Sequence, residues 1–194
     1  MTKNLSFCFK GSRTYIHGTD IMSSLLACFK GKEITEIDVK FHGVSKRNLG
    51  LVVGDELTDA KVNISLCVDS EEKLFQMIES GEEIDCRYEY DEDDLVDQCQ
   101  LDLENKQVHL SRVTGYSFYE NFVAMNKHLL QSLYPEEQGK WYFTRIEQEK
   151  QISDEALITV KLIKNFNFRL TKSDILLEGK KLGSVYFTMV KGQK

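Results

Sequence analysis

The chain has 194 residues, of which 41% are hydrophobic and 29% charged, and its net charge is −6. This composition is too apolar for a disordered protein, and the acidic balance argues against a general nucleic-acid-binding protein. No apolar run approaches the ~20 residues of a membrane-spanning helix, and the N-terminal segment MTKNLSFCFKGSR has no secretory signal pattern. We therefore expect a globular protein of the cytoplasm, without a membrane span.

In the first half of the chain, alternating apolar residues predict strands at residues 7–9, 37–41, 49–53, 62–68 and 84–90. A helix is predicted between the first two strands. It begins at Thr19, a favourable N-cap, with Asp20 in the first turn, and ends at Phe29. Because little of its surface is polar, we expect this helix to be buried nearly all round.

A second helix is predicted over Ser70–Ser80, where Leu74, Phe75, Met77 and Ile78 follow a helical spacing and Gly81 comes next. Its charged residues place it on the surface.

In the second half, strands are predicted at residues 99–103, 108–110, 141–146, 158–162, 166–170 and 185–189. A third helix begins at Ser117, which forms a capping box with Glu120, and Pro135 stops it. The segment Glu178–Lys181 joins the last two apolar runs as a hairpin turn. The expected fold class is therefore α+β, with antiparallel strands dominating.

The five cysteines are an odd number without a C-x-x-C pair, and most have apolar neighbours: Cys8, Cys28, Cys67, Cys86 and Cys99. We interpret them as reduced thiols of a cytosolic protein.

The sequence contains no signal for a metal or another cofactor, and we expect none. No histidine pair has ligand spacing, and the acidic run Glu89–Asp97 lacks the glycine and spacing of a calcium loop, so we expect it to be a solvated turn. A glycine-rich phosphate loop and a Gly-x-Ser-x-Gly elbow are both missing from the sequence.

A repeat is suggested by the layout of the chain. Ser12-Arg13 and Ser111-Arg112 each follow a strand and precede a helix, and each helix is followed by several strands. This layout predicts two α+β halves, residues 1–95 and 96–194.

The order of strand, turn, buried helix and antiparallel strands resembles the hotdog fold, in which a curved sheet wraps a central helix. The residues that carry the resemblance are Phe7–Phe29 and Asn165–Val190. The second segment is similar to the polar turn, D-x-L and G-x-V run that closes many acyl-thioester dehydratases and thioesterases. Because the order occurs twice, the chain resembles a double hotdog, two such units in one polypeptide.

The resemblance implies a site near the N-terminal end of a central helix, at the junction of two units. That position holds Tyr15, His17, Gly18 and Asp20 in the first half. Unpaired N–H groups at a helix start favour negative charge on a thioester oxygen, and a histidine beside them is biased toward the neutral form that a base requires. His17 is thus the candidate catalytic base, and Gly18 lets a substrate carbonyl approach the backbone.

The corresponding loop of the second half, Val113–Glu120, offers Tyr116 as a substrate-binding residue and Glu120 as its only carboxylate. Glu120 is the second catalytic candidate, although its simpler role is the capping box. His42, next to Gly43 at a strand end, is a candidate second polar group facing the same site. The Gly-His-x-x-Gly-type loop of dehydratases and the Asp-to-Asn/His constellation of many thioesterases are both missing.

Three functions remain open. The first is an enzyme of fatty acid metabolism that acts on acyl-CoA or acyl-carrier protein, as a 3-hydroxyacyl-thioester dehydratase or a thioesterase. The second is a non-catalytic hotdog protein that binds an acyl chain or a protein partner. The third is a β-rich interaction protein unrelated to hotdog proteins. The sequence is compatible with a monomer or a homo-oligomer.

The charge of the chain is uneven, since residues 159–194 carry eight Lys or Arg against two acidic residues. This basic stretch suits an acidic carrier protein or a phosphorylated ligand. The simpler interpretation is a set of solvated strand faces.

Overall fold

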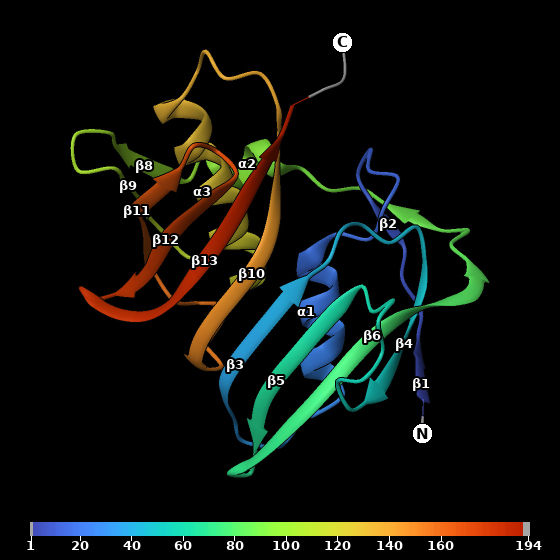
Figure 1. Ribbon diagram of the computed structural model, residues 1–194. Coiled ribbons are helices and arrows are strands. Elements are labelled where there is room, and N and C mark those ends of the chain that lie inside the picture. The colour runs from blue at the N-terminus through green and yellow to red at the C-terminus, as the bar shows by residue number, and fades with distance from the viewer. Residues whose placement is uncertain (1, 192–194) are drawn as a thin grey trace. The chain divides into compact units, whose positions relative to one another are not determined.

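The computed structural model describes residues 2–191 (Figure 1). The chain divides into two compact units. The first unit comprises Met1–Asp91 with Glu147–Gln151, and the second comprises Glu92–Ile146 with Ile152–Lys194. Among residues 2–191, no helix is long and apolar enough to cross a membrane.

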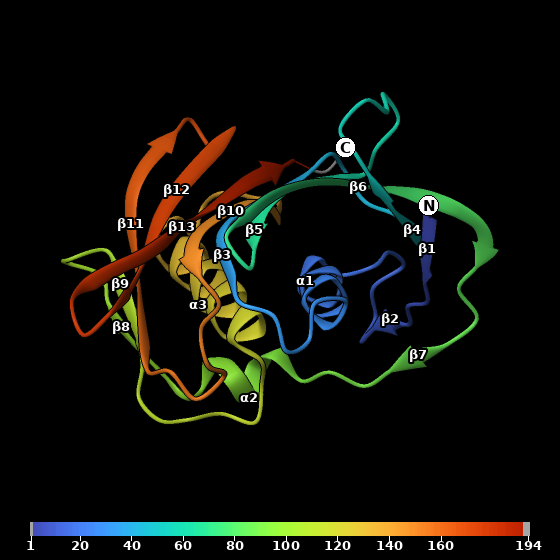
Figure 2. The same ribbon diagram turned by 90° about the horizontal axis from the view of Figure 1, so that it is seen from below.

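The first unit holds one helix and seven strands of its own: β1 (Thr2–Leu5), β2 (Phe9–Lys10), α1 (Gly18–Ala27), β3 (Ile34–Phe41), β4 (Arg47–Val53), β5 (Val62–Val68), β6 (Glu71–Glu83) and β7 (Arg87–Tyr88). Five of the strands form an antiparallel sheet in the order β1-β4-β6-β5-β3. The remaining two, β2 and β7, pair in parallel as a separate small sheet. In Figure 2 the larger sheet curves around α1.

The core of the first unit lies between α1 and the concave face of this sheet. The helix buries Ile21, Met22, Leu25 and Leu26. The strands bury apolar side chains at alternate positions: Val39, Leu49, Leu51, Ile64, Leu66, Phe75 and Met77. Ser23 and Ala27 of the helix are exposed, so the expectation of burial nearly all round holds for one side only.

The predicted helix over Ser70–Ser80 is wrong, because this segment is the strand β6. Asp69 and Ser70 have φ angles of 49° and 68°, and their turn brings Glu71 opposite Val68. The chain therefore folds back on β5, and β6 gains ladder hydrogen bonds to both β5 and β4. The spacing of its apolar residues fits both a helix and a strand, and pairing with the neighbouring strands makes the segment a strand.

The second unit contains α2 (Glu92–Val96), β8 (Cys99–Asp102), β9 (Gln107–Leu110), α3 (Phe118–Leu133), β10 (Lys140–Lys150), β11 (Ile158–Phe166), β12 (Leu170–Leu177) and β13 (Lys180–Val190). Its strands follow the order β10-β13-β12-β11-β9-β8. The last residues of β10 belong to the first unit. The predicted hairpin turn before β13 is confirmed, since Glu178 and Gly179 have φ angles of 49° and 78°.

The core of the second unit lies between α3 and its sheet. The helix buries Phe118, Phe122, Met125 and Leu129. The centroid of the Phe143 ring on β10 lies 5.7 Å from the centroid of the Phe122 ring and 5.8 Å from that of the Phe187 ring on β13. The predicted capping box at the start of α3 is confirmed.

Three shorter predictions need correction. The strand predicted at residues 84–90 is reduced to β7. The strand predicted at residues 166–170 is interrupted by a turn, in which Asn167 and Phe168 have φ angles of 51° and 61°. The acidic run contains α2 rather than only a solvated turn, because Leu95 is fully buried and anchors one helical turn.

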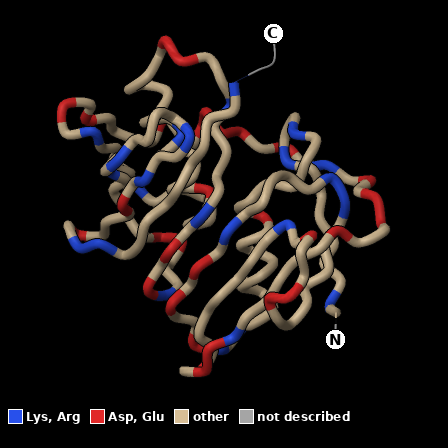
Figure 3. The backbone as a smooth tube through the Cα atoms, viewed as in Figure 1, with Lys and Arg blue, Asp and Glu red and all other residues tan. Residues whose placement is uncertain are grey.

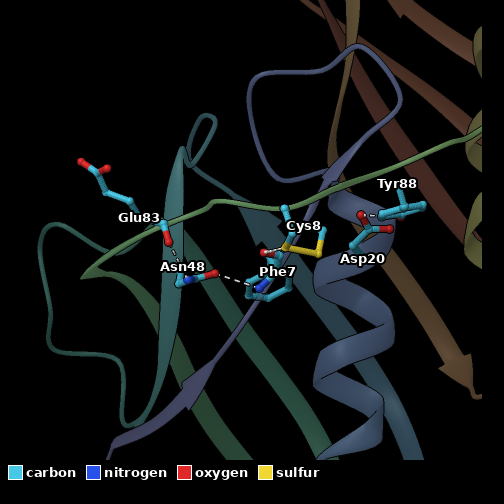
Figure 4. The surroundings of a disulfide bond; sticks show 7 residues. Phe7, Cys8, Asp20, Asn48, Glu83 and Tyr88 are labelled. Carbon is cyan, nitrogen blue, oxygen red and sulfur yellow. Dashed lines mark hydrogen bonds between the residues drawn. A yellow bond between two sulfur atoms is a disulfide. The ribbon is translucent and has the colours of Figure 1, made fainter.

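The prediction that all five cysteines are reduced is also wrong. Cys8 and Cys86 form a disulfide, because the pairing of β2 with β7 brings their Cα atoms to 4.8 Å (Figure 4). Cys28, Cys67 and Cys99 are free. Burial raises the pKa of the Cys99 thiol to about 11.

Candidate functional site

The helix α1 begins with His17 rather than Thr19 as its N-cap, which corrects the predicted start. His17 has an extended backbone, with φ −74° and ψ 139°. Its carbonyl accepts the N–H groups of Asp20 at 3.0 Å and Ile21 at 3.3 Å. Thr19 therefore lies inside the first turn, where its hydroxyl is free to bond to neighbours other than the helix backbone.

Two backbone N–H groups at the start of α1 donate no hydrogen bond to the described part of the chain. No acceptor within residues 2–191 takes a hydrogen bond from the backbone N–H of Gly18 or Thr19, and the His17 side chain does not cap the helix. The start of α3 is different, since Asp154 accepts the N–H of Phe118 at 2.7 Å and Ser117 accepts that of Glu120 at 3.3 Å. Of the two long helices, α1 therefore starts with two backbone donors that no acceptor of the described chain takes, one on the half-buried Gly18 and one on the fully buried Thr19.

Beside this helix start lies a fully buried cation, Lys10 of β2. Its Nζ donates hydrogen bonds to Thr19 Oγ1 at 3.1 Å and to Asp20 Oδ1 at 3.2 Å. The same atom lies 4.2 Å from the centroid of the Tyr90 ring and 5.8 Å from that of Tyr88. The ammonium is therefore compensated by a carboxylate and by two aromatic faces, as a buried charge requires.

His17 joins this group through its Nδ1, which lies 2.7 Å from Thr19 Oγ1. The Thr19 hydroxyl in turn donates to Asp20 Oδ1 at 3.3 Å. The other carboxylate oxygen of Asp20 accepts the Tyr88 hydroxyl at 2.9 Å (Figure 4). Lys10, His17, Thr19, Asp20 and Tyr88 thus form one hydrogen-bonded group, which we call the helix-start cluster.

The cluster is held by the pairing of β2 with β7. The N–H of Phe9 donates to the carbonyl of Cys86 and that of Gly11 to the carbonyl of Tyr88, both at 2.9 Å. The Cys8–Cys86 disulfide lies next to these bonds. Gly11 has a φ of 56°, which lets the chain turn directly after Lys10.

A second anchor lies one residue before the disulfide. The N–H of Phe7 donates to Asn48 Oδ1 at 2.8 Å, and Asn48 Nδ2 donates to the carbonyl of Glu83 at 3.2 Å (Figure 4). One buried side chain of β4 therefore fixes both segments that the disulfide links.

Two other predicted residues lie on the loops around His17. Tyr15 is half-buried, and the following N–H, that of Ile16, donates to the carbonyl of Ser45 at 2.8 Å. His42 is exposed at the end of β3 and begins the loop that contains Ser45. Within residues 2–191 the His42 side chain makes no hydrogen bond, so it lies on an adjacent loop without joining the cluster.

The predicted residues of the second half lie in the second unit. Glu120 Oε2 accepts the N–H and the hydroxyl of Ser117, both at 2.8 Å. The Tyr116 hydroxyl donates to Asp94 Oδ2 at 3.3 Å. The structure thus gives Glu120 the role of the capping residue and holds Tyr116 against α2, which contains Asp94.

No protein-family model matches the sequence, and no curated protein matches it. Among solved structures, the tesB protein of Mycobacterium avium subspecies paratuberculosis has a TM-score of 0.53 and 10% sequence identity, over 97% of this chain and 93% of that chain. The chain has the hotdog fold. GphF dehydratase 1 has a TM-score of 0.49 and 11% sequence identity, over 98% of this chain and 93% of that chain. A fusion DH domain has a TM-score of 0.48 and 11% sequence identity, over 99% of this chain and 88% of that chain.

The predicted hotdog fold is therefore confirmed, and it contains a cluster that the sequence did not predict. Lys10, Thr19 and Tyr88 were missed as members of a polar site. Lys10 stands between an aromatic residue and a glycine in a short strand, and nothing local indicates a buried cation there. The only sequence signal for Tyr88 was its place in an alternating run.

Figure 3 marks the Lys and Arg residues and the Asp and Glu residues along the backbone. Two lysines of the basic stretch form ion pairs with acidic residues. Lys181 pairs with Asp174 at 2.8 Å, and Lys191 pairs with Glu137 at 3.0 Å.

No group of three or more potential metal ligands occurs within residues 2–191.

Proposed function

We propose that this protein binds acyl thioesters, carried by coenzyme A or by acyl-carrier protein, at the start of α1, and that it acts on them as a dehydratase-like or thioesterase-like enzyme. Support comes from the hotdog fold and from the helix-start cluster. The observation that carries the proposal is the pair of open N–H groups at Gly18 and Thr19, which follow a histidine directly.

These two donors suit a thioester carbonyl. Negative charge develops on the carbonyl oxygen when a proton leaves the neighbouring carbon or when water attacks the carbonyl carbon. Two backbone N–H groups at the positive end of a helix stabilise that charge without reorganising. Since residue 18 is a glycine, no side chain projects from the first helical position to keep the substrate away.

His17 is proposed as the base that takes the proton, either from the substrate carbon or from water. Tyr15, Asp20, His42 and Tyr116 are proposed to line the substrate path, and Glu120 to supply a carboxylate. Asp20 already accepts bonds from Lys10 and Tyr88, which supports a role in holding the cluster together.

We further propose that residues 1–95 and 96–194 are two hotdog units fused in one chain. This is supported by the presence, in each compact unit, of one long helix packed on an antiparallel sheet. A fused pair is expected to act as a monomer, with homo-oligomers as the alternative. The cytoplasm stays the proposed location, and the redox state of Cys8 and Cys86 in cells is the measurement that tests it.

Activity of the purified chain on acyl-CoA and acyl-carrier substrates, both 3-hydroxyacyl and saturated, tests the proposed reaction. His17→Ala is expected to lower turnover by about 10²–10⁴-fold while the protein stays folded. Ser23→Ala is the matched control, because Ser23 is exposed on the same helix. Equal turnover by the wild type and H17A contradicts the role of His17.

Binding of the same substrates separates the remaining functions. Binding without turnover by the wild type supports the non-catalytic hotdog protein that binds acyl chains. If the wild type neither binds nor converts any of these thioesters, the proposed function fails and the interaction protein stands.

A further inference from the structure

We propose that Lys10 is a positioning residue that sets the tautomer of His17 through Thr19, so that Nδ1 carries the proton and Nε2 carries the lone pair. The use of that lone pair as a base rests on the proposed function. The tautomer itself is inferred from the atoms that surround the Thr19 hydroxyl in the helix-start cluster.

The argument starts from the Thr19 hydroxyl, which has one hydrogen to donate and two lone pairs to accept with. Three polar atoms surround Thr19 Oγ1, namely Lys10 Nζ at 3.1 Å, Asp20 Oδ1 at 3.3 Å and His17 Nδ1 at 2.7 Å. An ammonium only donates and a carboxylate only accepts, so both of their roles toward Thr19 are fixed.

The role of His17 follows from these two. Lys10 fills one lone pair of Thr19, and the hydroxyl hydrogen goes to Asp20, because a carboxylate is a stronger acceptor than a neutral imidazole nitrogen. The second lone pair is left for His17, and a nitrogen that donates must carry the proton. Nδ1 is therefore protonated, and Nε2 is the acceptor nitrogen.

Lys10 is built to hold this arrangement. Its side chain is fully buried, with Asp20 at 3.2 Å and the Tyr90 ring at 4.2 Å, so the ammonium has a fixed position. The bond of Gly11 to Tyr88 and the Cys8–Cys86 disulfide fix the backbone on either side of it. Lys10 Nζ also donates to Asp20 Oδ1 and so holds the oxygen that accepts the Thr19 hydroxyl. Without the ammonium that oxygen is no longer held beside Thr19, so the hydroxyl is able to donate to Nδ1 instead, which places the proton of a neutral imidazole on Nε2.

The test is the ¹⁵N NMR spectrum of the full chain with ¹⁵N-labelled histidine, recorded at a pH where His17 is neutral. The two ring nitrogens have different shifts according to which carries the proton, and His17→Gln identifies the signals. The wild type is expected to have the proton on Nδ1. Lys10→Met and Thr19→Val are expected to move the population toward the Nε2–H form, and Thr19→Ser is expected to restore the wild-type tautomer.

Lys3→Met is the matched control, since Lys3 lies exposed on β1 of the same unit, and it is expected to leave the tautomer unchanged. A wild-type spectrum with the proton on Nε2 overturns the proposal, and so does a T19V spectrum identical to that of the wild type. If K10M does not fold, the wild type and the Thr19 variants still decide the question.

A kinetic measurement separates this inference from the proposed function. If the protein turns over acyl thioesters, Thr19→Val is expected to lower kcat by about 10²-fold, the lower end of a general-base contribution, with a smaller change in KM. If the tautomer is as expected and no thioester is bound, the proposed function fails and the inference stands. If turnover is present with the proton on Nε2, the inference fails alone.

Discussion

The hydroxyl of Tyr88 donates a hydrogen bond to Oδ2 of Asp20 at 2.9 Å, across 68 residues of sequence. This bond connects β7, a strand of only two residues, to the first turn of α1. Short strands are weak by themselves, so β7 depends on ties to other segments: the parallel pairing with β2, the disulfide of Cys86, the bonds of the Arg87 side chain to the carbonyls of Gly11 and Arg13, and this hydroxyl. The start of α1 is therefore coupled to a segment far away in the chain.

Replacing Tyr88 by Phe removes one of these ties. We expect the free energy of unfolding to fall by about 0.5–1.5 kcal/mol, because a solvent-accessible hydrogen bond contributes about that much. Urea denaturation measures the change. Tyr134→Phe is the control, since the Tyr134 hydroxyl makes no hydrogen bond within residues 2–191. Equal stability of Y88F and the wild type would show that the bond adds nothing to folding.

The disulfide gives a larger prediction. It links residues separated by 78 positions, so it restricts the unfolded chain strongly. The Cys8→Ala, Cys86→Ala double variant is expected to lose about 2–4 kcal/mol of unfolding free energy, the typical stabilisation by a disulfide. Calorimetry or urea denaturation measures the loss, with the free thiol variant Cys28→Ala as the control. Reducing the wild type with a dithiol is expected to have the same effect on stability as the double variant.

The start of α3 distinguishes a structural from a catalytic role of Glu120. Ser117→Ala is expected to lower stability by about 1 kcal/mol through loss of the cap. Glu120→Gln keeps an oxygen that accepts the Ser117 N–H, so its stability is expected to stay within about 0.5 kcal/mol of the wild type. If E120Q folds normally and loses thioester turnover, Glu120 acts in catalysis. Unchanged turnover leaves it with the capping role alone.

These variants also show which features the sequence was able to predict. The cap of α3 was predicted because Ser117 and Glu120 are three positions apart, and their interaction depends on no other part of the chain. The strand β6 was not predicted, because the spacing of its apolar residues also fits a helix. Its pairing with β4 and β5 is what makes this segment a strand. Local patterns fix local structure, whereas pairing partners fix the rest.

The candidate site divides in the same way. His17 and Gly18 were predicted at the mouth of the central helix, and the structure places them there, with the helix cap at His17, two positions before the predicted cap at Thr19. The burial of Lys10 was not predicted, because it depends on Tyr88 and Tyr90, which come from a segment almost eighty residues away. A cation between two tyrosines leaves no pattern in a linear sequence.

Acid sensitivity is expected at the loop that supports His17. Glu79 Oε1 accepts the Ser45 hydroxyl at 2.7 Å and the N–H of Lys46 at 3.1 Å, and the Ser45 carbonyl accepts the N–H of Ile16. Partial burial tends to raise the pKa of Glu79, but these two hydrogen bonds and the charges of Lys61 and Arg47 outweigh it. The net result is a pKa below the usual 4.5.

The sign of the pH effect follows from that direction. The unfolded chain binds the proton of Glu79 more tightly than the folded chain, so the carboxylate stabilises the fold fully above the unfolded pKa of about 4.5. This contribution is lost as the pH falls through the lower folded pKa. Glu79→Gln is therefore expected to be less stable than the wild type at neutral pH, and the difference is expected to shrink toward zero in acid.

Urea denaturation of both proteins at neutral pH and at several acidic pH values measures this convergence. Glu82→Gln is the control, because Glu82 lies on the same strand and its carboxylate makes no hydrogen bond within residues 2–191. A stability difference between E79Q and the wild type that stays constant from neutral to acidic pH contradicts the prediction. Convergence in acid for E79Q, with no difference for E82Q at either end, ties the acid sensitivity of the His17 loop to this one carboxylate.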